Sequence, residues 1–278
     1  MKHILLLAAG LALLASGCGL QSSRPGLLLV STTSTQDSGL LDVLLPAFEQ
    51  QSGYHVMLVA VGSGQALQMG AEGNADVILP HSPAAEETFM ANGFGIDRRL
   101  VMHNDFVLVG PASDPARVRG RTPVTALQAI YTAKAAFVSR GDDSGTNVKE
   151  LALWKSAGLD LAGQPWYIET GQGQGATLTI ASEKEAYALT DRATFLAYHA
   201  NLDTEILVEG DPNLLNVYHV ITVNPARWPE INLAGARAFA DFITSPAGQA
   251  IIRDFGLEQY GQPLFFPDAG RDDSDLGL

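Results

Sequence analysis

The chain has 278 residues, of which 46% are hydrophobic and 8% aromatic, so it can bury a sizeable core and is neither disordered nor fibrous. A formal net charge of -13 excludes the basic surface that nucleic-acid binding requires. The same charge does not exclude a buried anion site. Salt screens the surface field over a Debye length of about 8 Å, whereas a buried site responds to its nearest dipoles and charges.

The first residues of the chain predict a targeting signal. Lys2 and His3 precede an apolar run over 4–14, and the small residues 15–17 lead directly to Cys18. The apolar run is shorter than the roughly 20 residues that a membrane-spanning helix needs. The pattern therefore predicts a signal peptide and an extracytoplasmic protein.

The residues around Cys18 resemble the bacterial lipobox, with Ala15 where Leu is commoner. This resemblance implies a lipoprotein signal peptide over 1–17 and a lipidated tether over 18–25 that anchors the protein to a membrane. The alternative is an ordinary secretory signal with an incidental cysteine. In either case the mature domain forms no internal disulfide, because Cys18 is the only cysteine.

Strand-like and helix-like segments alternate after the tether. Strands are expected over 26–30, 54–61 and 75–79, and helices over 39–51 and 65–72. In the first helix the apolar residues recur at helical spacing, at Leu40, Leu41, Leu44, Leu45 and Phe48. This alternation predicts an α/β protein with parallel sheets covered by helices.

Two further strand-like runs, 106–109 and 217–223, are each entered from a polar residue, Asp105 and Asn216. The length of the chain suits one large domain or two smaller lobes. If both runs cross between two lobes, one lobe is discontinuous and the other continuous. The predicted boundaries are 26–105 plus 220–278 for lobe I, and 106–219 for lobe II.

A first polar loop, over 31–38, places six hydroxyl side chains just before the helix that starts near Gly39. Helix N-termini carry unpaired N–H groups and the positive end of the helix dipole, so they favour anions. An ordinary Ser/Thr cap is the alternative, but a cap needs only one or two hydroxyls. The loop is a candidate anion site.

A second loop, 61–65, also separates a strand from a helix, and its glycines let a ligand approach the backbone closely. By itself it would indicate only a turn. It becomes a candidate because ligands bind at the carboxyl ends of parallel strands, and both loops follow strands of one predicted sheet. Ser63 is its candidate ligand-binding residue.

The third loop, 139–146, follows a strand over 136–138 and precedes a helix that reaches Trp154. Its Arg140 can donate two parallel hydrogen bonds to an oxyanion, while Ser144, Gly145 and Thr146 complete a cradle at the helix start. We expect Asp142 to orient Arg140, since a carboxylate cannot donate to a dianion. A surface arginine paired with surface acids is the alternative.

The pattern Arg140-x-Asp142-x-Ser144-Gly145-Thr146 resembles the signature of periplasmic phosphate-binding proteins. Longer strings resemble a narrower relative, the tungstate-binding component of an ABC importer. These strings are 31–41, 139–146 and 168–173, together with 104–106, 190–192 and 209–212. The resemblance covers nearly all of the mature chain.

The resemblance implies a two-lobed periplasmic-binding-protein fold of type II, with tungstate held in the cleft between the lobes and delivered to a membrane permease. Carried over residue by residue, it assigns ligand binding to Thr32, Thr33, Ser34, Arg140 and Thr146. Ser31 stands where the family usually has Thr. We expect a monomer with no cofactor, no bound metal cation and no enzymatic activity.

The protonation state of an oxyanion at neutral pH determines which kind of site it favours. Tungstate is fully deprotonated at neutral pH, so hydroxyls and one arginine can satisfy it. Phosphate retains a proton and favours a pocket with a carboxylate acceptor, for which Asp37, Asp142 and Asp143 are candidates. Phosphate therefore remains the alternative ligand, and molybdate, nearly equal in size, is not distinguished from tungstate.

A serine hydrolase is the alternative from another class, because 141–145 loosely matches Gly-Asp-Ser-Gly, but an extra aspartate interrupts the match. No histidine lies in the three loops, and His81, although it could lie near the cleft, is expected to be solvated. The glycine run 171–175 is expected to be a hinge or lid. The acidic end, 268–278, is expected to be a solvated tail.

Overall fold

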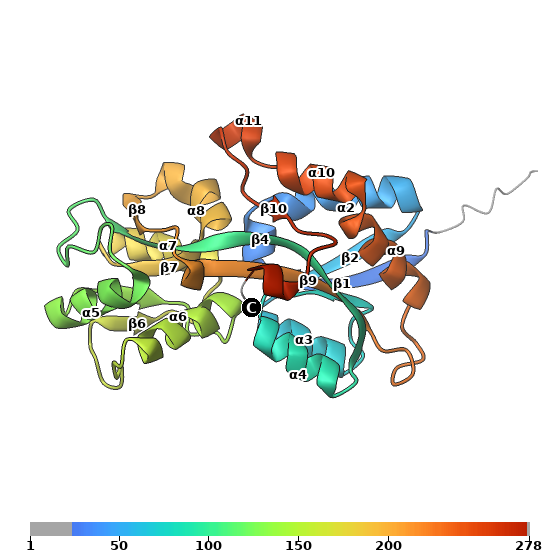
Figure 1. Ribbon diagram of the computed structural model, residues 1–278, viewed down its shortest axis with the longest axis horizontal. Helices are drawn as coiled ribbons and strands as arrows, with labels where there is room; N and C mark the ends of the chain where they lie inside the picture. Colours follow the sequence, from blue (N-terminus) through green and yellow to red (C-terminus); the bar gives the residue numbers. More distant parts are fainter. Residues whose placement is uncertain (1–23, 277–278) are drawn as a thin grey trace, which may run out of the picture.

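The computed structural model describes residues 24–276, so the predicted signal peptide and Cys18 lie outside the described residues. Strands and helices alternate along the chain, in two groups joined by β4 and β9 (Figure 1). The first part of the chain contains β1 (Gly26–Thr32), α1 (Thr33–Asp37), α2 (Leu40–Ser52), β2 (His55–Val61), α3 (Ser63–Ala71), β3 (Val77–Leu79), α4 (Pro83–Ala91) and β4 (Gly95–Pro111).

The middle part contains α5 (Pro123–Ala133), β5 (Phe137–Ser139), α6 (Gly145–Ser156), β6 (Tyr167–Glu169), α7 (Gln174–Glu183), β7 (Ala188–Asp191), α8 (Arg192–Tyr198), η1 (His199–Asn201), β8 (Thr204–Val208) and η2 (Pro212–Leu214). The chain then returns to the first group. The returning part contains β9 (Leu215–Val223), α9 (Leu233–Thr244), α10 (Pro246–Asp254), α11 (Leu257–Tyr260), β10 (Phe266–Pro267) and η3 (Asp273–Leu276).

The helix α2 shows how local sequence sets these elements. It lies between two glycines in the left-handed region, Gly39 at φ 83° and Gly53 at φ 76°, a conformation that other residues rarely adopt. The helical spacing of its apolar residues puts Leu40, Leu44 and Phe48 on the buried face. The periodicity thus predicted both the helix and the face that packs against the sheet.

The large sheet is mixed, so the prediction of parallel sheets holds for only part of it. Strand β1 lies parallel to β2 on one side and to β3 on the other, but β3 and β4 both run antiparallel to β9. The antiparallel part arises because the chain returns through β9 after completing the middle segment. The carboxyl ends of β1 and β2 lie together at one edge, as the parallel part of the prediction requires.

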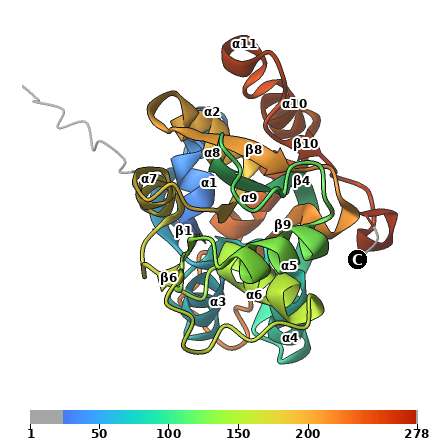
Figure 2. The same ribbon diagram turned by 90° about the vertical axis from the view of Figure 1, so that its left-hand side faces the viewer.

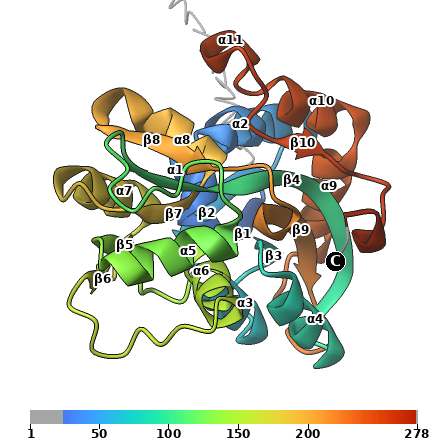
Figure 3. The same cartoon turned by 60° about the vertical axis from the view of Figure 1, so that its left-hand side comes forward.

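The long strand β4 runs from one group of elements to the other (Figure 3). It pairs with β9 as far as Asp105, and from Phe106 onward with β7 and β8. Its first half was missed by the sequence analysis because charged residues interrupt its apolar pattern. The strand begins at Gly95, eleven residues before the predicted run 106–109.

The buried apolar residues form separate clusters on either side of this crossing. One large cluster packs α2 and α9 onto β1 around Phe48 and Phe239, and another surrounds Phe137 and Trp154. The pairing of β9 with β4 extends from Leu215 to Val223. The predicted division into lobes, 26–105 plus 220–278 and 106–219, stays a prediction.

The acidic C-terminal segment is attached to the protein through Asp268 and Asp273, and for these two residues the prediction of a solvated tail was wrong, whereas Asp272 and Asp275 are exposed. Asp268 is 1% exposed and lies 2.6 Å from His103 Nδ1. Asp273 accepts hydrogen bonds from Arg98 at 2.7 Å and from His219 at 2.9 Å. These partners lie far upstream in sequence, so the run of acids by itself could not indicate them. Within residues 24–276, no helix combines the length and apolarity needed to cross a bilayer.

Candidate anion cleft

The three predicted loops meet between the two groups of elements. Strands β1 and β2 end side by side, and their loops continue into the starts of α1 and α3. Gly62 packs against Ser144 of the third loop so closely that a Cβ there would lie 3.2 Å from Ser144 Cα. The starts of α3 and α6 are therefore neighbours (Figures 2 and 3). We call the region between these loops the anion cleft.

The first loop is already helical in the structure, because Thr33–Asp37 form the short helix α1. Thr32 caps this helix through its side chain, and its Oγ1 lies 2.6 Å from Thr35 Oγ1 and 3.2 Å from Ser34 Oγ. All three side chains are buried, whereas Thr33 is half-buried. The hydroxyls lie at a helix N-terminus as predicted, but at that of the short helix α1 and not at that of α2, which starts at Leu40.

Arg140 is the cation of the cleft and is only 2% exposed. Its Nη2 donates to Thr33 Oγ1 at 3.0 Å, across the gap between the two groups of elements. Its Nε and Nη2 donate to Asp142 Oδ2 at 3.1 and 2.6 Å, so Asp142 orients the guanidinium as expected. Asp142 Oδ1 also accepts a hydrogen bond from the Ser144 N–H at 3.2 Å, and the carboxylate is therefore fully engaged.

The start of α6 supplies the remaining predicted residues. Ser144 is its N-cap and accepts a hydrogen bond from the Asn147 N–H at 3.2 Å. Gly145 and Thr146 follow in the first turn, both buried. Thr146 Oγ1 has no hydrogen-bond partner within residues 24–276. An unpaired buried hydroxyl has a free-energy cost of about 1–3 kcal/mol, so it indicates a place for a ligand oxygen.

His81 belongs to the cleft, and the expectation of a solvated side chain was wrong. It is 4% exposed, its backbone N–H donates to Ser63 Oγ at 3.3 Å, and its Nε2 lies 3.3 Å from Ser34 Oγ. Burial, together with the positive charge of Arg140, lowers the pKa of His81 to about 3. The ring is therefore neutral at physiological pH. A possible signal was its position directly after β3, at the same edge of the sheet as the first two loops.

A ring of polar residues lies behind the hydroxyls. Asp191 caps α8 and accepts a hydrogen bond from the Thr194 N–H at 2.8 Å, and the Thr194 hydroxyl donates to the Ser34 carbonyl at 3.1 Å. Burial raises the pKa of Asp191 to about 6, although hydrogen bonds from Thr194 and the charge of Arg140 act in the opposite direction. These contacts join α8 to the first loop.

The glycine run 171–175 packs over the cleft. The Gly171 N–H donates to the Arg140 carbonyl at 2.7 Å, and the Gly175 N–H donates to Asp37 Oδ2 at 3.4 Å. Helix α7 begins within the run, at Gln174, and lies beside α1 (Figure 2). The segment connects the two groups of elements, and its role as a hinge or lid stays a prediction.

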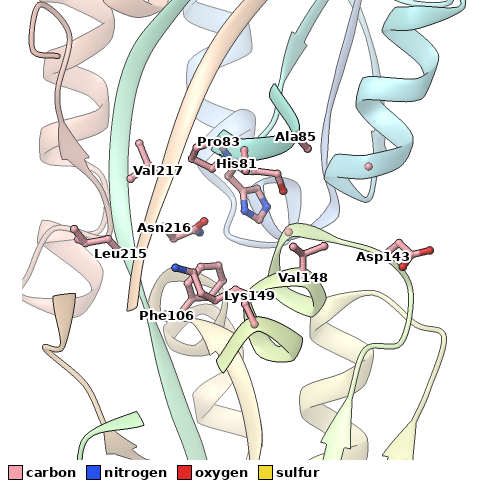
Figure 4. A pocket seen from close by; sticks show the side chains of 15 residues that line it. His81, Pro83, Ala85, Phe106, Asp143, Val148, Lys149, Leu215, Asn216 and Val217 are labelled. Atoms are coloured by element: carbon pink, nitrogen blue, oxygen red, sulfur yellow. The ribbon is translucent and has the colours of Figure 1, made fainter. Parts of the chain in front are cut away.

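A mostly apolar pocket of about 300 Å³ adjoins the cleft at His81 (Figure 4). Phe106 and Val217 line it from the crossing strands, and Val148 and Lys149 line it from α6. Gly64, His81 and Gly145 line the pocket as well, so it adjoins the starts of α3 and α6 directly (Figure 4). Its lining is mostly apolar, whereas the buried hydroxyls and Arg140 supply the hydrogen-bond donors that an oxyanion needs.

The arrangement does not form a hydrolase triad. Ser144 Oγ accepts a backbone hydrogen bond as the cap of α6, and within residues 24–276 it has no histidine partner. Ser34 does lie near His81, but His81 Nδ1 has no hydrogen-bond partner there, whereas a triad requires an acidic residue at that nitrogen. A ring with a pKa of about 3 is also a weak general base at neutral pH.

Comparison with known proteins identifies close relatives. Residues 20–247 match the family described as the PBP superfamily domain. The chain is 47% identical over 287 aligned positions to the tungstate-binding protein TupA of Peptoclostridium acidaminophilum, and the alignment covers 98% of this chain and 100% of the relative.

Two solved structures are similar to the whole domain. The tungstate ABC transporter structure from Geobacter sulfurreducens is 48% identical, with a TM-score of 0.76, and the match covers 83% of this chain and 98% of that one. The tungstate-binding protein TupA from Desulfovibrio alaskensis G20 is 45% identical, with a TM-score of 0.75, over 88% of this chain and 99% of that one.

Proposed function

The chain belongs to the PBP superfamily and to its tungstate-binding family of ABC-importer components, and from that membership we propose how its cleft works. The protein is an extracytoplasmic solute-binding protein for oxyanion import, and its relatives are transport proteins rather than enzymes. We propose that its ligand is tungstate. The proposed ligand-binding residues are Thr32, Thr33, Ser34, Ser63, Arg140, Ser144, Gly145 and Thr146.

One observation carries the proposal: a single buried arginine stands among buried neutral donors from both groups of elements. The starts of α3 and α6 add backbone N–H groups and the positive ends of two helix dipoles. Each hydrogen bond to a charged acceptor contributes about 1.5–3 kcal/mol. Several such bonds support tight binding without a surplus of buried positive charge, which suits an anion that only accepts hydrogen bonds.

Phosphate is the alternative ligand, and the carboxylates near the cleft favour it less than the sequence suggested. Asp142 is already engaged by Arg140 and by the Ser144 N–H. Asp143 is exposed, and Asp37 accepts a hydrogen bond from Gly175. None of these three is both buried and unpaired, which favours tungstate or the similar molybdate. Asp191 is buried, and its Oδ2 has no partner within residues 24–276, so phosphate stays the alternative ligand.

We further propose that the anion first binds the hydroxyls of the first two loops. Closure of the lobes then brings Arg140 and the start of α6 onto it, and the closed protein delivers the anion to a membrane permease. The predicted lipid on Cys18 would hold the protein at the membrane, near that permease. We expect the protein to act as a monomer.

Calorimetric titration of the mature domain with tungstate, molybdate, sulfate and phosphate tests the proposal. We expect tight binding of tungstate and molybdate and much weaker binding of phosphate and sulfate. Selective phosphate binding would refute the proposed ligand and leave the cleft assignment standing. Absence of binding to all four anions would refute the cleft assignment as well.

A further inference from the structure

His81 is in contact with all three anion loops. Its backbone N–H donates to Ser63 of the second loop, and its Nε2 lies 3.3 Å from Ser34 Oγ of the first. In the third loop, a Cβ added at Gly145 would lie only 2.6 Å from His81 Cε1 and Nδ1. A Cβ there would also lie 3.0 Å from the His81 carbonyl oxygen, so a larger side chain would displace the imidazole and crowd the backbone. One ring therefore joins loops that come from both sides of the cleft.

Aromatic neighbours hold this ring in place. Its centroid lies 4.9 Å from that of Tyr218 and 6.4 Å from that of Phe106. Asn216 lies beside it in Figure 4, and this amide donates to Asn104 and to the Tyr218 hydroxyl, each at 2.8 Å. A ring that is packed on its faces and buried has a defined orientation toward Ser34.

The neutral imidazole carries one N–H, and the structure indicates where it lies. Nε2 has Ser34 Oγ as its partner, whereas Nδ1 has no hydrogen-bond partner within residues 24–276. A proton on Nε2 is therefore hydrogen-bonded, while for a proton on Nδ1 the acceptor beside the ring is Asn216 Oδ1, an oxygen that makes no hydrogen bond within residues 24–276.

This tautomer decides what the Ser34 hydroxyl can do. A serine hydroxyl has a single proton, and Ser34 Oγ has two polar neighbours, Thr32 Oγ1 and His81 Nε2. If Ser34 donated to His81, only lone pairs would face the anion, and these repel a deprotonated oxyanion. If His81 donates, the Ser34 proton is free for the ligand.

On the basis of the proposed function, we propose that His81 is a positioning residue of the anion cleft. Its Nε2–H donates to Ser34 Oγ and turns the Ser34 proton toward the bound oxyanion. Its ring edge also sets how closely the start of α6 approaches at Gly145. His81 acts through Ser34 and Gly145, and it makes no contact with the anion in this proposal.

A matched pair of variants tests the contact with Ser34. The amide nitrogen of H81Q reaches the place of Nε2, whereas that of H81N ends near the place of Nδ1. We expect tungstate affinity to fall about tenfold in H81N and to stay within about threefold of wild type in H81Q, as for loss or retention of one hydrogen bond. Unfolding midpoints of the ligand-free proteins establish that both variants are folded.

The same pair of variants in an S34A background distinguishes an effect through the Ser34 hydroxyl from an effect of the changed size of the side chain at position 81. With the hydroxyl removed, S34A and S34A/H81N should bind tungstate equally well. Equal affinity of H81N and wild type would overturn the proposal, and so would a further tenfold loss from H81N in the S34A background. If His81 had a purely structural role, H81N would lower tungstate affinity by the same factor with and without the Ser34 hydroxyl.

The contact with Gly145 has its own test. G145A should weaken tungstate binding about tenfold or more in wild type, and by less in H81A, where the ring no longer meets the added methyl group. An equal loss in both backgrounds would overturn this part. If the wild-type protein binds none of the four oxyanions, the proposed function fails; if it binds and the His81 variants match it, only this inference fails.

Discussion

Two buried polar clusters of this protein differ in how far their groups are paired. In the anion cleft, Thr146 Oγ1 and His81 Nδ1 have no hydrogen-bond partner within residues 24–276. The second cluster consists of Glu86, Arg98, His219 and Asp273, and we call it the paired cluster. In it, Glu86 Oε2 lies 3.1 Å from Arg98 Nε and 2.8 Å from His219 Nδ1.

The difference between the clusters indicates their roles. The paired cluster is complete: Asp273 adds contacts of 2.7 Å to Arg98 and 2.9 Å to His219, and so fastens the C-terminal segment to the sheet. Burial alone would raise the pKa of Asp273, but hydrogen bonds from Arg98 and His219 lower it. Completed pairing stabilises the fold, whereas the unpaired Thr146 hydroxyl is available to a ligand. Substitutions in the cleft should therefore lower tungstate affinity, and substitutions in the paired cluster should lower stability alone.

The largest expected effect is that of R140A in the cleft. Loss of two hydrogen bonds to a charged ligand, each contributing about 2 kcal/mol, should lower tungstate affinity roughly 1000-fold. The ligand-free protein should also unfold at a lower temperature, because Asp142 loses its buried cation partner. Calorimetry and thermal unfolding measure the two quantities. R119A, which removes an exposed arginine paired with Glu205, is the matched control. Affinity of R140A within tenfold of wild type would contradict the assignment.

An intermediate case is Glu150, which is buried and hydrogen-bonded to Trp154 and Tyr167 but has no cation partner among the described residues. Burial raises its pKa to about 7. The folded state then keeps a proton that the unfolded chain releases near its ordinary pKa, so the free energy of unfolding falls as pH rises through that interval.

For E150Q, urea unfolding at pH 5 and pH 8 should show a smaller decrease with pH than wild type, by about 3 kcal/mol. The exposed E183Q variant should follow wild type. Parallel pH profiles of wild type and E150Q would show that Glu150 is ionised throughout.

In the paired cluster, D273A should lower the free energy of unfolding by about 2 kcal/mol, because Arg98 and His219 lose a carboxylate partner. Tungstate affinity should stay within about twofold, since the cluster does not include the proposed ligand-binding residues. Urea unfolding and calorimetry test these two expectations, with the exposed neighbour D272A as control. A large loss of affinity in D273A would remove the distinction between the clusters.

The smallest expected effect has opposite signs for stability and binding. T146V keeps the shape of the side chain and removes a buried hydroxyl without a partner, so the ligand-free protein should gain about 1 kcal/mol. Tungstate affinity should fall about fivefold because one donor is lost. T146S keeps the hydroxyl and should retain affinity. A T146V variant less stable than wild type would indicate that the hydroxyl already has a structural role.

Much of the fold follows from local patterns. The spacing of Leu40, Leu44 and Phe48 sets the buried face of α2, and the three loops after β1, β2 and β5 were recognised from hydroxyls, glycines and Arg140. These features depend on residues a few positions apart. The contact between Arg140 and Asp142, two residues away, could be predicted for the same reason.

The missed features all involve distant partners. The position of His81 after β3 indicates the edge of the sheet but not its contacts, because Ser34 and Gly145 are brought to it only by the sheet and by the approach of α6. Likewise, the acids of the C-terminal segment have the composition of a solvated tail. The attachment of Asp268 and Asp273 depends on His103, Arg98 and His219, which are presented by β4 and β9.

The sequence by itself determined the alternation of strands and helices, the positions of the anion loops and the presence of one arginine among hydroxyls, since helix periodicity, capping and turn chemistry act over short distances. Only the tertiary structure decided which polar groups are paired. Pairing depends on burial and on contacts between residues more than a hundred positions apart, as between Arg140 and Thr33, or between Asp273 and Arg98. The pairing of polar groups therefore distinguishes the anion cleft, which has unpaired groups, from the paired cluster, whose members all have partners.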